Sequence, residues 1–201
     1  MRYQLEWQTP AGVLIAREPL LDEVAPYAPR LAAAYNDPHN ALLLGHTAEL
    51  SPADVLAHYR SLAEDGGRSF LFFRDGALAG DGDLRGVGGG AAEFAFLVAD
   101  PGAQGKGLGT RFALMVHALA FGPLALERIY ASVIPENTAS RRVFEKLGHA
   151  IDDSATARAY ADEDGDIVLS IDRAAFARAH GGAAAEIRIG AADDLDSFTR
   201  P

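Results

Sequence analysis

One stretch limits the folds open to this chain more than any other: an apolar strand that passes through a glycine-rich turn into a helix. Residues Glu93–Ala99 are almost entirely apolar, which is typical of a strand covered on both faces. The Asp-Pro-Gly sequence at 100–102 ends this strand, because proline cannot donate a ladder hydrogen bond and glycine permits a turn. An apolar segment of helical length follows at Thr110–Ala120. This order of elements predicts an α/β domain.

The turn at 104–109, which reads Gln-Gly-Lys-Gly-Leu-Gly, has the composition of an anion-binding loop. Bare backbone N–H groups, about half a positive charge from the helix dipole and missing Cβ atoms all favour a phosphate at such a place. A Walker A loop is excluded because Lys106 is followed by Gly107 rather than serine or threonine. A dinucleotide fingerprint drawn through residues 86–91 is rejected because it precedes a strand instead of opening a helix.

A second strand, turn and helix follow. Arg128–Ile134 is β-branched and apolar, and the Pro-Glu-Asn sequence at 135–137 ends it. We expect a helix over Thr138–Leu147, capped by Asn137 or Thr138. Gly148 is placed to terminate this helix.

These two units carry a pair of motifs in a recognisable order. Gln104, Gly107 and Gly109 fit the pattern Q-x-x-G-x-G, and residues 137–148 fit N-x-x-S-x-x-x-x-x-K-x-G. Together they resemble the two CoA-binding motifs of the GCN5-related N-acetyltransferases (GNAT). The resemblance is close over Glu93–Gly148 and loose elsewhere. The sequences Y-N-D-P-H-N and S-P-A-D-V-L-A-H-Y, between residues 35 and 59, are similar to the RimJ/RimL-like branch, in which this region borders the acceptor pocket.

The resemblance implies a GNAT fold: a mixed, central, twisted sheet of about six to seven strands with helices on both faces. We expect one domain over residues 1–180 and a peripheral or mobile tail over 181–201, broken from the domain at Gly181 and Gly182. The implied function is transfer of an acetyl group from acetyl-CoA to a primary amine, directly and within a ternary complex. A protein N-terminus and a small polyamine-like or aminoglycoside-like amine both remain open as acceptors. The alternative is a non-catalytic CoA-binding sensor or regulatory module.

The resemblance also assigns the CoA contacts. The backbone of Leu97, Val98 and Ala99 is expected to pair with the pantetheine arm like an added strand. The backbone amide of Asn137 is expected to reach the same arm. The pyrophosphate is assigned to the backbone amides of Gln104, Gly105, Lys106, Gly107, Leu108, Gly109 and Thr110. We expect no metal, since no histidine or carboxylate group has ligand spacing.

Glu93 is the candidate general base. It lies eleven residues before Gln104, the placement of the base in the histone-acetylating branch of the superfamily. The plainer interpretation is a strand-end glutamate, solvated or paired with an arginine. The acid is less obvious, because Phe144 stands where many relatives have tyrosine. The RimL-like branch can use the motif serine, here Ser140, and Tyr130 and Ser132 are weaker alternatives.

Composition sets the remaining expectations. The 201 residues include no cysteine, which excludes disulfides, thiolate metal sites and a cysteine nucleophile. A net charge of −10 argues against nucleic acid and suits a cationic acceptor. The start has no signal-peptide core, and no apolar run approaches the ~20 residues of a membrane span. We therefore expect a cytoplasmic protein that forms a monomer or a homodimer.

Overall fold

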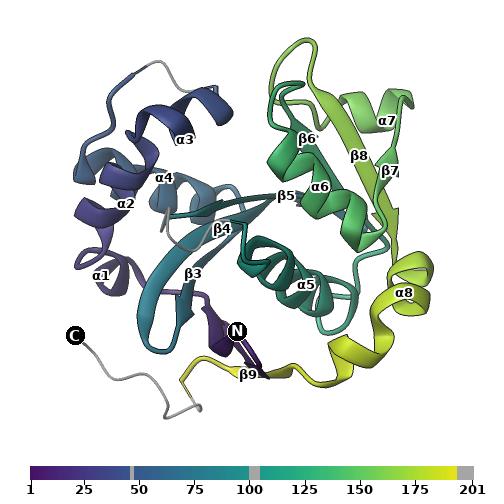
Figure 1. Ribbon diagram of the computed structural model, residues 1–201, viewed down its shortest axis with the longest axis horizontal. Helices are drawn as coiled ribbons and strands as arrows, with labels where there is room; N and C mark the ends of the chain where they lie inside the picture. Colours follow the sequence, from purple (N-terminus) through teal and green to yellow (C-terminus); the bar gives the residue numbers. More distant parts are fainter. Residues whose placement is uncertain (46–47, 100–104, 194–201) are drawn as a thin grey trace.

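The chain folds around one mixed, twisted β-sheet with helices on both faces (Figure 1). The computed structural model describes residues 1–45, 48–99 and 105–193. Within these residues the sheet has nine strands in the order β7-β8-β6-β5-β4-β3-β2-β1-β9, and every pair is antiparallel except β5 with β6. The strands are β1 (Tyr3–Thr9), β2 (Gly12–Arg17), β3 (Arg68–Arg74), β4 (Ala77–Gly88), β5 (Ala91–Val98), β6 (Arg128–Val133), β7 (Ala150–Ile151), β8 (Ile167–Asp172) and β9 (Arg188–Ala191).

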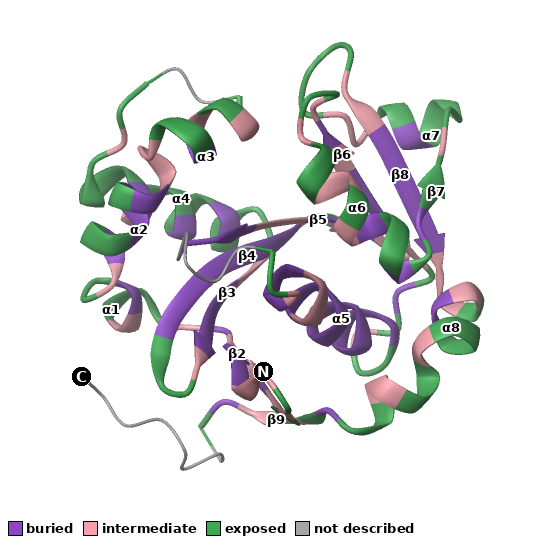
Figure 2. Cartoon of the chain, in the orientation of Figure 1, coloured by how far each residue is buried: buried purple, intermediate pink, exposed green. Residues whose placement is uncertain are grey.

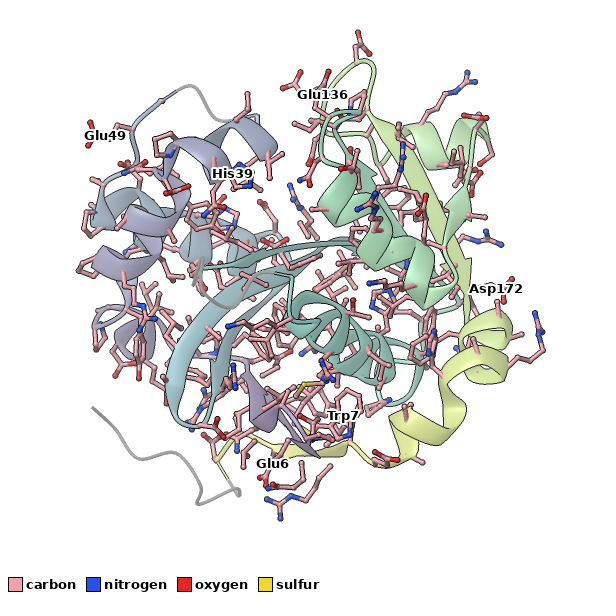
Figure 3. The ribbon with its side chains drawn as sticks, in the orientation of Figure 1. Glu6, Trp7, His39, Glu49, Glu136 and Asp172 are labelled. Atoms are coloured by element: carbon pink, nitrogen blue, oxygen red, sulfur yellow. The ribbon has the colours of Figure 1, made fainter. Side chains whose placement is uncertain are left out.

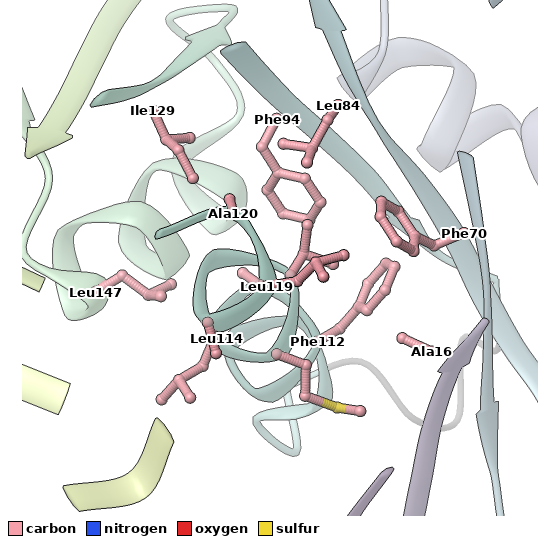
Figure 4. Close-up of a cluster of buried hydrophobic side chains, with 14 of the residues drawn as sticks. Ala16, Phe70, Leu84, Phe94, Phe112, Leu114, Leu119, Ala120, Ile129 and Leu147 are labelled. Atoms are coloured by element: carbon pink, nitrogen blue, oxygen red, sulfur yellow. The ribbon is translucent and has the colours of Figure 1, made fainter. Parts of the chain in front are cut away.

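The helices divide between the two faces. They are α1 (Leu21–Val24), α2 (Ala28–Tyr35), α3 (Pro38–Leu43), α4 (Pro52–Glu64), α5 (Leu108–Phe121), α6 (Thr138–Leu147), α7 (Ala155–Arg158) and α8 (Arg173–Ala185). Helix α5 is buried along nearly its whole length and forms the larger core with β1–β6, α6 and α8 (Figures 2 and 4). Helices α1, α2 and α4 cover β2, β3 and β4 from the other side. No helix in the described ranges is long and apolar enough to cross a membrane.

The expected fold class is confirmed, with more strands than the six to seven predicted. The strands beyond that number include β1, whose residues alternate polar and apolar around Trp7, and the short strands β7 and β9 at the two edges of the sheet. After α6 only Ala150 and Ile151 pair with the sheet, and Ser154 then caps the short helix α7.

The chain after residue 172 is joined more tightly than expected. The break at Gly181 and Gly182 is wrong, because α8 continues through both glycines to Ala185. Strand β9 follows the helix and pairs with β1. Side chains reinforce this edge, where Figure 3 labels Glu6 and Trp7: the indole N–H of Trp7 donates to Glu186, and Arg188 forms an ion pair with Glu6.

The parallel pair β5 and β6 opens into a V, which is the feature that positions the site (Figure 1). Their ladder runs only from Ala91 opposite Arg128 to Glu93 opposite Tyr130. Past that point β5 stays paired with β4 and β6 stays paired with β8. The two strands therefore diverge immediately after Glu93.

Candidate functional site

The glycine loop leads into α5 as the sequence predicts. Gly105 and Gly107 have φ values of 73° and 78°, which side chains other than glycine adopt at a cost. Gly107 is the N-cap of α5, and no side chain caps the helix there. The amides of the first turn are therefore left for a ligand or water. The guanidinium of Arg111 donates to the carbonyl oxygens of Lys106 and Gly107, which adds positive charge to the loop. Gln104 lies outside the described residues.

Gly109 lets α5 approach β5 closely. A Cβ atom at this position would lie 2.9 Å from the ring of Phe96. Phe144 of α6 contacts the same ring, with centroids 5.9 Å apart, and is 2% exposed. Phe144 is therefore a core residue at the position where many relatives are expected to have a tyrosine that acts as the proton donor. Strand β5 carries Leu97 and Val98 past the opening of the V, and the N–H of Ala99, which follows the strand, donates to Ala79 of β4.

Asn137 organises the start of α6. Its side-chain oxygen accepts a hydrogen bond from the amide of Ser140 at 2.9 Å, which confirms it as the N-cap. Its Nδ2 atom donates to the carbonyl oxygen of Leu43, at the C-terminal end of α3. Ser140 is half-buried in the first turn of α6. The structure thus brings Ser140 and Asn137 together at one helix start.

A row of charged residues crosses the opposite face of the sheet from α5. On β4, Asp81, Asp83 and Arg85 alternate with glycine or leucine, so their side chains share one face. The glycines face α5: a Cβ on Gly82 would lie 3.0 Å from Phe112 and 2.6 Å from a carbonyl oxygen of β5. The Gly-Asp-Gly-Asp sequence thus serves two purposes, close packing on one face and acidity on the other.

Asp81 is held by two tyrosines. It is 3% exposed and accepts hydrogen bonds of 2.9 Å from the hydroxyls of Tyr35 and Tyr59. Burial raises the pKa of Asp81 to about 7, although both tyrosine bonds act to lower it. These tyrosines come from α2 and α4, so the helices that precede β3 form one wall of the site.

Glu93 lies where β5 and β6 separate, opposite Arg85 in the β4–β5 ladder. Its side chain is 7% exposed, and its Oε2 atom is 3.6 Å from Nε of Arg85. Burial raises the pKa of Glu93 to about 8, while Arg85 acts to lower it. Oε1 of Glu93 is buried and has no hydrogen-bond partner among the described residues. Glu93 is therefore both a buried carboxyl and the partner of an arginine.

Arg85 is shared among three carboxylates. Its Nε atom is 3.2 Å from Oδ1 of Asp83, and its Nη1 atom donates to Oδ1 of Asp162 at 3.1 Å. Asp162 comes from the loop between α7 and β8. His58 of α4 adds a contact of 3.2 Å to Asp83, whose hydrogen bond raises the pKa of His58. We call Asp81, Asp83, Glu93 and Asp162 the carboxylate cluster.

Tyr130 and Ser132, the alternative proton donors, each contact defined neighbours. Tyr130 is 4% exposed and stacks on Tyr160 with centroids 4.2 Å apart. Ser132 donates to Asp166 at 2.6 Å and accepts from the amide of Asp162 at 3.0 Å. Ser132 therefore holds the α7–β8 loop. No group of three or more histidine, aspartate or glutamate side chains in the described ranges is arranged to hold a metal ion.

Several residues of this site were not identified from the sequence: Tyr35, Tyr59, Asp81, Asp83, Arg85, Arg111 and Asp162. One signal was available. Aspartates two residues apart in a strand share one face of the sheet, and the glycine-rich turn after them places that face beside Glu93 on the next strand. The contribution of Asp162 had no such signal, because it depends on how a distant loop folds back.

Comparison with known proteins agrees with this geometry. Residues 19–150 match the family described as the acetyltransferase (GNAT) domain. No curated protein matches the chain significantly. Among solved structures, RimJ of Mycobacterium smegmatis bound to CoA-disulfide is 23% identical, with a TM-score of 0.69 over 92% of this chain and 96% of that one.

Two further structures have the same fold. The aminoglycoside acetyltransferase AAC(6')-Ib in complex with coenzyme A and kanamycin is 23% identical, with a TM-score of 0.67 over 82% of this chain and 98% of that one. The ribosomal-protein-S5-alanine acetyltransferase of Vibrio fischeri is 18% identical, with a TM-score of 0.65 over 84% and 96%.

Proposed function

Because the chain belongs to the acetyltransferase (GNAT) family, we propose that it acetylates a cationic primary amine by direct transfer within a ternary complex. Family membership makes the protein an acetyl-CoA-dependent N-acetyltransferase. The acceptor and the roles of individual residues are our proposal. The observation that carries it is the carboxylate cluster, which lies beside the V where the backbone of β5 leaves its parallel partner.

The cluster suits an ammonium group. The carboxylates of Asp83 and Asp162 outnumber the single guanidinium between them, and the site lies on a chain whose net charge is −10. Such an excess of carboxylates attracts cations and raises their local concentration. Two of the similar structures are of enzymes named for amine acceptors, one an aminoglycoside and one a ribosomal protein. The cluster supports a positively charged amine without distinguishing these two sources.

Acetyl-CoA is proposed to enter between β5 and β6. The backbone of Leu97, Val98 and Ala99 would pair with the pantetheine arm, using groups other than the N–H of Ala99. The amides of Gly105 to Thr110, with Gln104, would hold the pyrophosphate at the uncapped start of α5. The amide of Asn137 would contact the pantetheine from the other side.

Glu93 would act as the general base. A free alkyl amine has a pKa of about 10.4 and must lose a proton before its nitrogen can attack the thioester carbon. A carboxyl with a pKa of about 8 accepts that proton at a cost roughly 5 kcal/mol lower than one at the ordinary 4.5, at about 1.4 kcal/mol per pKa unit. The C–N bond forms, the C–S bond breaks, and the nitrogen loses its second proton as the amide forms. Ser140 is the proposed proton donor to the CoA thiolate, and its hydroxyl regains a proton from that nitrogen or from solvent.

Acceptor screening tests the proposal. Thiol release from acetyl-CoA would be measured with diamines, aminoglycosides, peptides with free N-termini and a neutral amide as a blank. We expect turnover with cationic amines, and a higher acceptor KM in Asp83→Asn with the KM for acetyl-CoA unchanged. Asp164→Asn, an equal charge change at an exposed position of the α7–β8 loop, is the matched control. Thiol release that is independent of any amine would overturn the proposal.

A further inference from the structure

Arg85 lies at the centre of the site, although its positive charge would repel a cationic acceptor. Its guanidinium contacts a strand neighbour, Asp83, the proposed base, Glu93, and a loop residue, Asp162. Of the three, Glu93 is the most distant at 3.6 Å, against 3.2 Å and 3.1 Å for the aspartates. The two aspartates therefore hold the guanidinium at the edge of contact with Glu93.

We propose that Arg85 is a positioning residue for Glu93, and that Asp162 controls how closely the guanidinium approaches the Glu93 carboxylate. The inference rests on the proposed function, in which Glu93 takes the proton of the amine. Asp83 is fixed to the same strand as Arg85, whereas Asp162 reaches the site from the α7–β8 loop. Asp162 is therefore the partner that another conformation of the loop could remove.

The loop is itself anchored within the site. The amide of Asp162 donates to Oγ of Ser132, and the same hydroxyl donates to Asp166 at the end of the loop. Ser132 lies on β6, two residues beyond Tyr130, which pairs with Glu93. The hydrogen bonds of Ser132 thus connect β6 to the loop and position Asp162, and Asp162 in turn positions Arg85.

The charges around Glu93 act in defined directions. Arg85 stabilises its ionised form, while Asp83 and Asp162 destabilise it, and the Ser132 amide favours ionisation. His58 faces the group only through Asp83, and Tyr130 lies beside it on β6. Removal of the Asp162 charge has two effects with the same sign. It deletes a repulsive carboxylate and releases Arg85 toward Glu93, so the pKa of Glu93 falls.

The first measurement is independent of turnover. The pKa of the Glu93 carboxyl would be followed by NMR titration of its side-chain carbon in the intact chain without acceptor. We expect the pKa in Asp162→Asn to fall by about one unit, the scale on which a nearby charge acts. It should rise in Arg85→Gln and return toward the wild-type value in Arg85→Lys. Asp164→Asn, in the same loop, should leave it unchanged.

The second measurement is the pH dependence of kcat/KM. The rising limb should move to lower pH in Asp162→Asn by the same amount, and stay in place in Asp164→Asn. An unchanged Glu93 pKa in Asp162→Asn, or a rise, overturns the inference. If the pKa of Glu93 falls but the rate profile does not move, Arg85 does act on Glu93, but Glu93 is not the base. That outcome would contradict the proposed function and not the present inference.

Discussion

The Nδ2 atom of Asn137 donates a hydrogen bond of 2.9 Å to the carbonyl oxygen of Leu43, which joins the start of α6 to the end of α3. These helices lie on opposite sides of the opening between β5 and β6 (Figure 1). The same side chain caps α6 through its oxygen. One residue therefore stabilises a helix and links the side of the molecule proposed to bind the acceptor to the side proposed to bind CoA.

The two functions of Asn137 can be separated by substitution. Serine also caps helices well, so Asn137→Ser should keep most of the stability and lose the link to Leu43. Asn137→Ala loses both, and its free energy of unfolding should fall by about 1 kcal/mol. Urea denaturation measures stability, and calorimetry with CoA measures binding. If both variants bind CoA as tightly as the wild type, the link to α3 has no part in CoA binding.

Gly107→Glu should abolish CoA binding. Gly107 has a φ of 78° and begins α5, where a phosphate is expected. A carboxylate there would repel the pyrophosphate and cancel part of the helix dipole. Gly107→Ala is the control, since it carries the same backbone strain without the charge and should weaken binding far less. If calorimetry finds unchanged CoA affinity in folded Gly107→Glu, the pyrophosphate does not bind at this loop.

Glu93→Gln should lower turnover by about 10²–10⁴-fold while CoA affinity is kept, as removal of a general base does. Since the pKa of Glu93 is about 8, kcat/KM of the wild type should rise with pH up to that value as the base ionises. This rising limb should be lost in the variant, so the deficit should be largest above about pH 8, where the wild-type carboxylate is ionised. Glu127→Gln, at an exposed position, is the control. Turnover within a few-fold of wild type would make Glu93 a structural residue.

Ser140→Ala should cut turnover by about tenfold to a hundredfold without weaker CoA binding. The loss is modest because a thiol has a pKa of about 8.5 and its anion can leave without a proton. Tyr130→Phe is the comparison: Tyr130 is packed against Tyr160, and burial raises its pKa. Rate profiles that are identical to wild type in both variants would identify solvent as the donor.

Local chemistry explains what the sequence predicted well. Asn137 caps α6 through its own side chain, and Gly148 ends the same helix with a φ of 93°. Each of these features depends on a few neighbouring residues, so the pattern around it is sufficient. The two strand–turn–helix units were predictable for the same reason.

Long-range pairing explains what the sequence did not reveal. Strand β9 forms because a distant edge, β1, is available to it. The contact of Arg85 with Glu93 requires the register of the β4–β5 hairpin, and its contact with Asp162 requires the folding of a loop far along the chain. Register and loop position are fixed by the whole core.

Two buried histidines make the last prediction, which concerns stability. His117 of α5 and His149, which follows α6, lie with their Nε2 atoms 2.9 Å apart. Nδ1 of His117 donates to the carbonyl oxygen of Ala113, so neutral His117 accepts at Nε2 the proton that His149 donates. A further proton on Nε2 of His117 breaks this arrangement, because that nitrogen can then no longer accept a hydrogen bond. Burial lowers the pKa of His117 to about 4 and that of His149 well below 6.5.

The sign follows from these values. Between pH 6.5 and about 4 the unfolded chain binds protons that the folded pair does not, so the pair's contribution to stability falls as pH falls. At pH 5 the loss is about 2 kcal/mol for His117 alone. Glu93 and Asp81, with raised pKa values, act oppositely, so variants must be compared. The free energy of unfolding, measured by urea denaturation, should fall less between pH 7 and pH 5 in His149→Gln than in the wild type. His39→Gln, at an exposed position, is the control and should match the wild type. An equal fall in the free energy of unfolding in the wild type and in both variants would show that the buried pair makes no contribution to the pH dependence of stability.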